Sequence, residues 1–260
     1  EGYHALLKIA ETYNGVLMCD GVGLGKTFIG LMLIERLLRD RKRIALIVPK
    51  AAREPVWESK LNKHLPGLTG EFSNFKIYNH TDLLRGDYQQ KMADVQRDAD
   101  VVIIDEAHHF RNQASKRYRK LFEMLESKTL FLLTATPINN SLFDLHHLIE
   151  LFSRKQEDYF QSVGINSLRY HFIEMERALE RLVGSSDADT ELTMAEAEQV
   201  LAKDDLTRRI VVQRSRAYAK RSQQQFGESN VIFPNREAPH VADYSLKKTY
   251  GSLLSNLKKA

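Results

Sequence analysis

The sequence has one cysteine, no long apolar run and no strong excess of either charge. A single thiol, Cys19, excludes an internal disulfide and a zinc site built from several cysteines, and its apolar neighbours predict a buried side chain. Without an apolar run of membrane-spanning length or a basic-then-apolar leader, we expect no membrane partner. The default compartment is then the cytoplasm, or the nucleus in a eukaryote, and the protein is not expected to be secreted.

The composition is otherwise that of a globular chain. A hydrophobic content of 43% over 260 residues supports a sizeable core in one to two domains. The net charge of +4 permits a nucleic-acid partner but does not require one. The chain does not begin with Met, and Glu1 stands just before a helical pattern, so we expect a fragment of a longer protein.

A glycine-rich stretch separates a short apolar run at residues 15–19 from a helical pattern at residues 28–38. Its glycines allow positive φ angles, so backbone N–H groups and the positive end of the helix can converge on a polyphosphate. Asp20 stands where the general phosphate-loop pattern has glycine. Lys26 can reach the β and γ phosphates, and Thr27 offers a hydroxyl to Mg²⁺. The predicted phosphate-binding residues are Gly21, Val22, Gly23, Leu24, Gly25, Lys26 and Thr27.

Further short apolar runs occupy residues 44–48, 75–78, 100–104 and 129–133, with helical patterns between most of them. Strands that alternate with helices predict an α/β fold with a parallel sheet and right-handed crossovers. Ligands of such sheets bind at the carboxyl ends of the strands. The polar clusters that follow three of the strands should therefore converge in space.

Two of these clusters carry candidate chemistry. Asp105 can hold Mg²⁺ opposite Thr27, and Glu106 can orient and deprotonate the water that attacks the γ-phosphate. The alternative is an acidic pair that caps the next helix. His108 could hydrogen-bond Glu106 or the segment of Thr134 and Thr136, and so couple the nucleotide site to the neighbouring element.

Three other histidines, His109, His146 and His147, show no such partner in the sequence. We interpret them as surface or packing residues, with a metal site as the less favoured alternative.

Together these motifs resemble motifs I, II and III of superfamily-2 helicases. They read Asp-Gly-Val-Gly-Leu-Gly-Lys-Thr at 20–27, Asp-Glu-Ala-His at 105–108 and Thr-Ala-Thr-Pro at 134–137. Finer features resemble the Swi/Snf-like branch of double-stranded-DNA translocases. These are Ile-Val-Pro at 47–49 with Trp57 downstream, Arg-Asn after the acidic box, the Ile-Asn-Asn and leucine-rich continuation after residue 137, and Gln-Arg-Ser-Arg at 213–216.

The resemblance implies a RecA-like P-loop lobe, a parallel sheet flanked by helices, with an α-helical insertion where no strand-like run occurs. We assign residues 1–152 to the ATP-binding lobe and 153–205 to the insertion. Residues 206–236 return to the lobe, and 237–260 are a connector and the start of a second lobe. The adenine-recognising motif of the family would lie around Glu1, and we do not find it.

In that family ATP and Mg²⁺ bind between two lobes, and the second lobe supplies arginine fingers. Arg214 and Arg216 lie within this lobe and are not assigned as fingers. Because such fingers are worth about 10³–10⁵ in rate, the isolated fragment should bind Mg·ATP weakly and hydrolyse it very slowly.

The resemblance also implies a nucleic-acid partner, expected to be double-stranded DNA, on the face near the second strand. Contacts to phosphates would position a duplex without reading its sequence. Candidates are Lys50, Arg53, Asn79, His80, Thr81, Arg111 and Lys116, with ordinary solvated side chains as the alternative for each.

The leading functional hypothesis is the first lobe of an ATP-driven DNA translocase. A strand-separating helicase, or the motor subunit of a restriction or phage-defence system, would use the same motifs, and strand displacement separates these alternatives. A nucleotide-gated interaction scaffold is a hypothesis from another class of protein. Such scaffolds often lack one of the catalytic residues, whereas all of them are present here. A small-molecule kinase does not explain the acidic and threonine boxes together.

Overall fold

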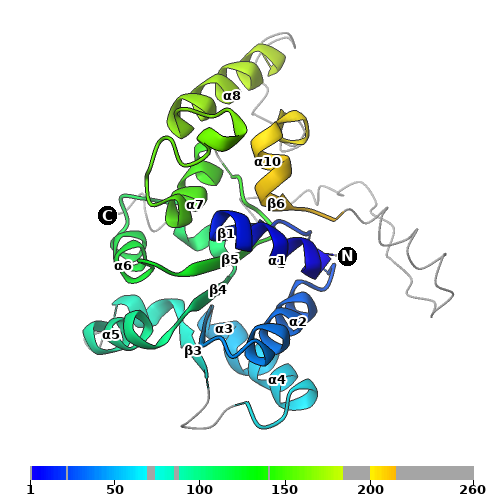
Figure 1. The fold of residues 1–260 in the computed structure, drawn as a ribbon, viewed down its shortest axis with the longest axis vertical. Coiled ribbons are helices and arrows are strands. Elements are labelled where there is room, and N and C mark those ends of the chain that lie inside the picture. Colours follow the sequence, from blue (N-terminus) through cyan, green and yellow to red (C-terminus); the bar gives the residue numbers. More distant parts are fainter. Residues whose placement is uncertain are drawn as a thin grey trace, which may run out of the picture. The chain divides into compact units, whose positions relative to one another are not determined.

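A computed structural model of the chain describes residues 2–21, 23–68, 74–84, 88–139, 141–183 and 200–214. Six parallel strands form one sheet, shown in Figure 1. They are β1 (Gly15–Met18), β2 (Ile44–Val48), β3 (Phe75–Asn79), β4 (Val101–Asp105), β5 (Thr129–Leu133) and β6 (Val211–Val212). The strand order is β3-β2-β4-β5-β1-β6. The predicted α/β, RecA-like parallel sheet is confirmed.

The α-helices cover both faces of the sheet. In chain order they are α1 (Gly2–Tyr13), α2 (Lys26–Arg39), α3 (Lys50–Ala52), α4 (Ser59–His64), α5 (Tyr88–Asp98), α6 (Lys116–Met124), α7 (Phe143–Ser153), α8 (Leu168–Val183) and α10 (Asp205–Ile210). A π-helical turn, η1 (Arg53–Glu58), joins α3 to α4, and 3₁₀ turns follow β3 and β4 as η2 (His80–Leu84) and η3 (Ala107–Phe110). A further 3₁₀ turn, η4 (Gln161–Val163), precedes α8.

Alternate residues of each strand enter two separate apolar cores, as the period of two in a strand requires. Leu46 and Ile103 pack in the core under α1, α2 and α4, whereas Ile47 and Ile104 pack in the core under α5, α6, α7, α8 and α10. Strands buried on both faces read as continuous apolar runs, which is why the sequence locates them well.

The register of the sheet aligns the carboxyl ends of four strands. Leu133 pairs with Met18 on one side and with Asp105 on the other, and Met18 pairs with Val212. The backbone continues this alignment, because the amide of Thr134 donates to the carbonyl of Met18 at 2.9 Å. The segments that follow β1, β4, β5 and β6 therefore leave the sheet at one edge.

The predicted strands at residues 44–48 and 129–133 agree with β2 and β5 to the residue. The sequence interpretation missed α5, because this helix is polar and buries little beyond Val95. Residues 210–212 contain both the end of α10 and β6. Between residues 139 and 205 the described residues form no strand, as predicted.

The domain boundaries remain predictions. Residues of α8, including Phe172 and Leu179, belong to the same apolar core as β4 and β5. The described residues leave out Val22, Arg216, the connector at 237–260 and residues 184–199 of the predicted insertion. None of the helices that the structure describes has the length and apolar character that a bilayer crossing requires.

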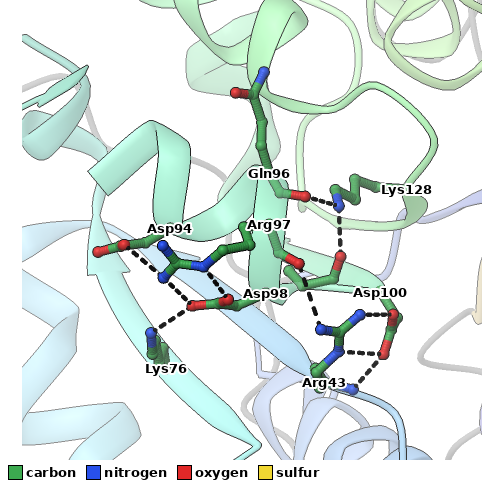
Figure 2. A network of polar contacts seen from close by, with 9 residues as sticks. Arg43, Lys76, Asp94, Gln96, Arg97, Asp98, Asp100 and Lys128 are labelled. Carbon is green, nitrogen blue, oxygen red and sulfur yellow. Dashed lines mark hydrogen bonds and ion pairs between the residues drawn. The ribbon is translucent and has the colours of Figure 1, made fainter. Parts of the chain in front are cut away.

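Paired charges surround the opposite edge of the sheet, where the strands begin (Figure 2). Asp100 accepts hydrogen bonds from the backbone amide, Nε and Nη2 of Arg43 at 2.9, 3.1 and 2.7 Å. Lys128 donates to the carbonyls of Gln96 and Ala99, both at 2.6 Å. These contacts join the segments that immediately precede β2, β4 and β5.

A cavity of about 220 Å³ opens beside this network. Its charged wall residues pair among themselves and with their neighbours, as in the ion pairs Lys76–Asp98 at 3.1 Å and Arg97–Asp94 at 3.0 Å. The cavity lies away from the edge where the candidate catalytic residues gather, so we assign it no function.

We expect Asp100→Asn to lower the thermal unfolding midpoint by a few degrees at pH 7. Hydrogen bonds from the Arg43 guanidinium lower the pKa of Asp100 from 3.8 to about 2. When folding lowers the pKa of a carboxyl, that group stabilises the folded state at any pH above its unfolded-state pKa. The stabilisation is lost as the pH falls through the folded-state pKa. The difference in unfolding midpoint between wild type and variant, measured by circular dichroism, should stay constant from pH 7 to about pH 4 and become smaller below that pH.

The control is Asp158→Asn, which changes an exposed carboxyl. If the difference in unfolding midpoint between wild type and Asp100→Asn does not become smaller at low pH, the Arg43–Asp100 ion pair is not its cause.

Candidate nucleotide site

The glycine-rich loop turns directly into α2. Gly23 and Gly25 have φ angles of +84° and +80°, a region that favours glycine, and Gly25 caps the helix. Gly21, predicted with them, is not among the positive-φ residues. A β-carbon at Gly23 would meet nothing within 4 Å, so the loop has open space on this side.

Lys26 and Thr27 are the first two residues of α2, and both are half-buried. The Lys26 ammonium donates to the carbonyls of Asp20 and Gly21 at 2.9 and 3.4 Å. Burial is the largest influence on the pKa of Asp105, which it raises, and on the pKa of His108, which it lowers; the charge of Lys26 is a smaller influence that lowers both.

Asp105 is the last residue of β4 and is only 8% exposed. Its Oδ2 accepts a hydrogen bond from the indole Nε1 of Trp57 at 2.7 Å, and its Oδ1 accepts from the amide of Glu106 at 3.0 Å. Burial raises the pKa of Asp105, and the bond from Trp57 opposes this shift. Each carboxylate oxygen has a second lone pair, so both can still accept from a metal-bound water.

Trp57, the only tryptophan, reaches Asp105 from the π-helical turn η1. Its ring is fully buried against α2, where a β-carbon on Gly30 would lie 2.6 Å from the indole Cη2. Gly30 thus leaves the space that the ring occupies. We expected Trp57 only as a family feature, and its contact with Asp105 was not predicted.

Glu106 has φ and ψ near +50°, an unusual conformation for a residue with a side chain. Strain of this kind persists where surrounding contacts fix the backbone, and it is frequent at functional sites. The preceding residue, Asp105, is fixed by such a contact: its carbonyl accepts a hydrogen bond from the Nε2 of His80 at 2.8 Å. The His80 ring is buried, and burial, followed by the charge of His109, lowers its pKa to about 3.

His108 contacts both of its predicted partners. Its Nδ1 lies 3.2 Å from the Glu106 Oε2 and 3.2 Å from the Thr134 Oγ1. Thr134 is buried, and its hydroxyl also accepts from the amide of Thr136 at 3.2 Å. Burial lowers the pKa of His108. The acidic box and the threonine box are therefore joined, although a coupling role stays a prediction.

Asp20 makes an ion pair that the sequence interpretation missed. Its fully buried carboxylate accepts from the backbone amide and Nε of Arg214, each at 2.7 Å, and from Nη2. The same Nη2 donates to the carbonyl of Leu24 at 2.8 Å. Arg214 follows β6, 194 positions along the chain. The residue that departs from the general phosphate-loop pattern thus anchors the loop to the last described segment.

The predicted nucleic-acid residues divide by burial. Asn79 and His80 are buried, so their side chains cannot reach a phosphate without rearrangement. Thr81 is half-buried, and its hydroxyl is enclosed. Exposed or half-buried cations remain at Lys50, Lys116, Arg53 and Arg111, although Arg53 pairs with Glu58 at 2.7 Å and Arg111 lies 3.8 Å from Asp144.

Cys19 is buried at 3% exposure, as predicted. Burial, followed by the charge of Asp20, raises the pKa of its thiol to about 12. A thiol with such a pKa stays protonated at neutral pH, so Cys19 contributes packing and no nucleophile.

Comparison with known proteins identifies relatives. The sequence pattern of the SNF2-related domain family matches residues 1–164. The "Uncharacterized ATP-dependent helicase YqhH" of Bacillus subtilis is 31% identical over 55% of this chain and 27% of its own length. The mouse "Chromodomain-helicase-DNA-binding protein 1-like" is 30% identical over 68% of this chain and 21% of its own length. The chain therefore spans about a quarter of these relatives.

A solved structure shares the fold. The "Sulfolobus solfataricus SWI2/SNF2 ATPase core in complex with dsDNA" aligns over 82% of this chain and 42% of the other chain, with a TM-score of 0.58 and 19% identity.

We expect Arg214→Ala to lower the free energy of unfolding by about 3 kcal/mol, because it leaves the buried Asp20 carboxylate without its cation. Asp20→Asn in the same background should recover part of this loss. Urea unfolding of both single variants and the double variant gives the coupling energy, expected at about 1 kcal/mol or more.

Arg208→Ala is the matched control, since this arginine is exposed on α10. Strictly additive effects of the two substitutions would contradict a direct Asp20–Arg214 interaction.

Proposed function

Because this chain belongs to the SNF2-related domain family, we propose that it is the ATP-binding lobe of an ATP-dependent motor that moves on double-stranded DNA. It hydrolyses ATP when a second lobe, in the same full-length protein, completes the site. One observation supports this most strongly. The register of β1, β5 and β4 brings the glycine-rich loop, the threonine box and the acidic box to one edge of the sheet.

The residues at this edge fit a nucleotide triphosphate. Two positive-φ glycines precede a helix of 14 residues, so N–H groups and the helix dipole point to one side. The open space beside Gly23 leaves room for phosphate oxygens. Lys26 would bind the β and γ phosphates from the first turn of α2.

Thr27 and Asp105 would hold the magnesium ion, which neutralises charge on the β and γ phosphate oxygens when it is bound. Trp57 fixes the Asp105 carboxylate by donating to one of its oxygens. A cation beside Asp105 also favours the charged form of this buried carboxyl.

Glu106 would orient the attacking water and accept its proton. Its side chain is 35% exposed, so water can reach it. His108, within 3.2 Å of both Glu106 and Thr134, would hold the carboxylate of Glu106 and transmit its position to the threonine box.

Duplex DNA is the proposed track. The Sulfolobus ATPase core was solved in complex with double-stranded DNA, and the present fold resembles that core. The exposed cations Lys50 and Lys116 can contact phosphates, which supports binding without sequence readout. A strand-separating helicase, which would use the same ATP site, is the alternative.

The test uses the full-length protein. Lys26→Ala should abolish nucleotide binding, because it removes the cation of the phosphate loop. Glu106→Gln should keep the affinity for Mg·ATP within a few-fold and lower DNA-stimulated hydrolysis by about 10² or more, because an amide accepts no proton. A fluorescent ATP analogue measures binding, and phosphate release measures turnover.

Lys42→Ala and Glu126→Gln, both at exposed positions, are the matched controls. Normal hydrolysis by Glu106→Gln would contradict the assignment of the general base. The isolated 260-residue chain should turn over about 10³–10⁵ times more slowly than the full-length protein.

A further inference from the structure

A second cluster of polar side chains lies on α7, away from the nucleotide site. It consists of His146, His147 and Glu150. The imidazole and carboxylate at positions 146 and 150 are one helical turn apart, so they project from the same face of the helix. One ligand atom from each of the three residues lies within 4.8 Å of the others.

Two of these side chains are buried with unsatisfied polar atoms. The side chains of His146 and Glu150 are 6% and 10% exposed. The His146 Nδ1 and the Glu150 Oε2 have no hydrogen-bond partner among the residues that the structure describes. The two atoms are 3.8 Å apart, which is too long for a hydrogen bond. A buried polar atom without a partner costs stability, so this pair needs an explanation.

His147 makes the kind of hydrogen bond that accompanies many histidine ligands. Its Nδ1 lies 2.7 Å from the carbonyl oxygen of Arg111, and a carbonyl only accepts. The proton is therefore on Nδ1, which leaves the lone pair on Nε2. A histidine ligand commonly donates its other ring nitrogen to a backbone carbonyl in this way.

We propose that His146, His147 and Glu150 bind a divalent cation of the zinc type. Two imidazoles and one carboxylate are a ligand set that Zn²⁺ takes, with water as a fourth ligand. Ligand atoms around tetrahedral zinc are about 3.4 Å apart, so these atoms, now within 4.8 Å of one another, would approach by up to about 1.4 Å. A bound ion would satisfy the two buried atoms that have no hydrogen-bond partner.

A metal bound at this site would restrain the segment that follows the acidic box in the sequence. His147 already holds the carbonyl of Arg111, and the hydroxyl of Tyr118 on α6 donates to the carbonyl of His147 at 3.2 Å. A metal on α7 would stiffen this connection. The proposal does not depend on ATP hydrolysis, since none of the three ligands belongs to the nucleotide site.

The experiment titrates the full-length protein, stripped with a chelator and kept free of nucleotide, with Zn²⁺ alone. Calorimetry should give one equivalent bound per chain, and Co²⁺ should give the intense visible absorption of a tetrahedral site. Zinc should raise the thermal unfolding temperature of the wild type, because it binds the folded state. Glu150→Gln and His147→Ala should each weaken zinc binding at least tenfold and remove most of the thermal shift.

Glu180→Gln and His64→Ala change an exposed carboxylate and an exposed imidazole and should bind zinc like the wild type. Glu150→Gln preserves the size of the side chain, and its unfolding temperature without zinc checks the fold. Absence of a stoichiometric site in the wild type, or undiminished binding by both ligand variants, would overturn the proposal.

Discussion

The pairing of Leu133 with Met18 on one side and Asp105 on the other is the constraint on which the rest depends. Three chain segments far apart in sequence leave the sheet at the same level because their strands are parallel and in this register. A shift of one residue in β4 would turn Asp105 to the opposite face of the sheet. The apolar cores fix the register, since each strand buries alternate residues in different cores.

Two buried carboxylates at this edge are each held by a donor from a distant segment. Asp20 is bound by Arg214, and Asp105 by Trp57. Burying a charge is unfavourable unless hydrogen bonds compensate, so each pair constrains geometry more than it adds stability. Arg214 joins the glycine-rich loop to the segment after β6, and Trp57 joins the acidic box to the turn after α3.

Local patterns predicted the parts of the structure that depend on local chemistry. Continuous apolar runs located β2 and β5, and the glycine-rich stretch contains positive-φ residues at Gly23 and Gly25, although not at Gly21. The polar helix α5 has too few apolar residues for a pattern to detect. The Asp20–Arg214 pair spans 194 positions, and no local signal reports it, although an aspartate at a glycine position was a clue. Burial of His80 likewise follows from tertiary packing, so it could not be predicted.

The most direct test of the account is a crystal structure of the chain with Mg²⁺ and a non-hydrolysable ATP analogue. The account predicts the phosphates on the amides of residues 23–27, with the Lys26 ammonium about 3 Å from a β or γ phosphate oxygen. It also predicts the magnesium ion between Thr27 and Asp105. An analogue bound away from the glycine-rich loop, or a magnesium ion with neither side chain in its surroundings, would contradict it.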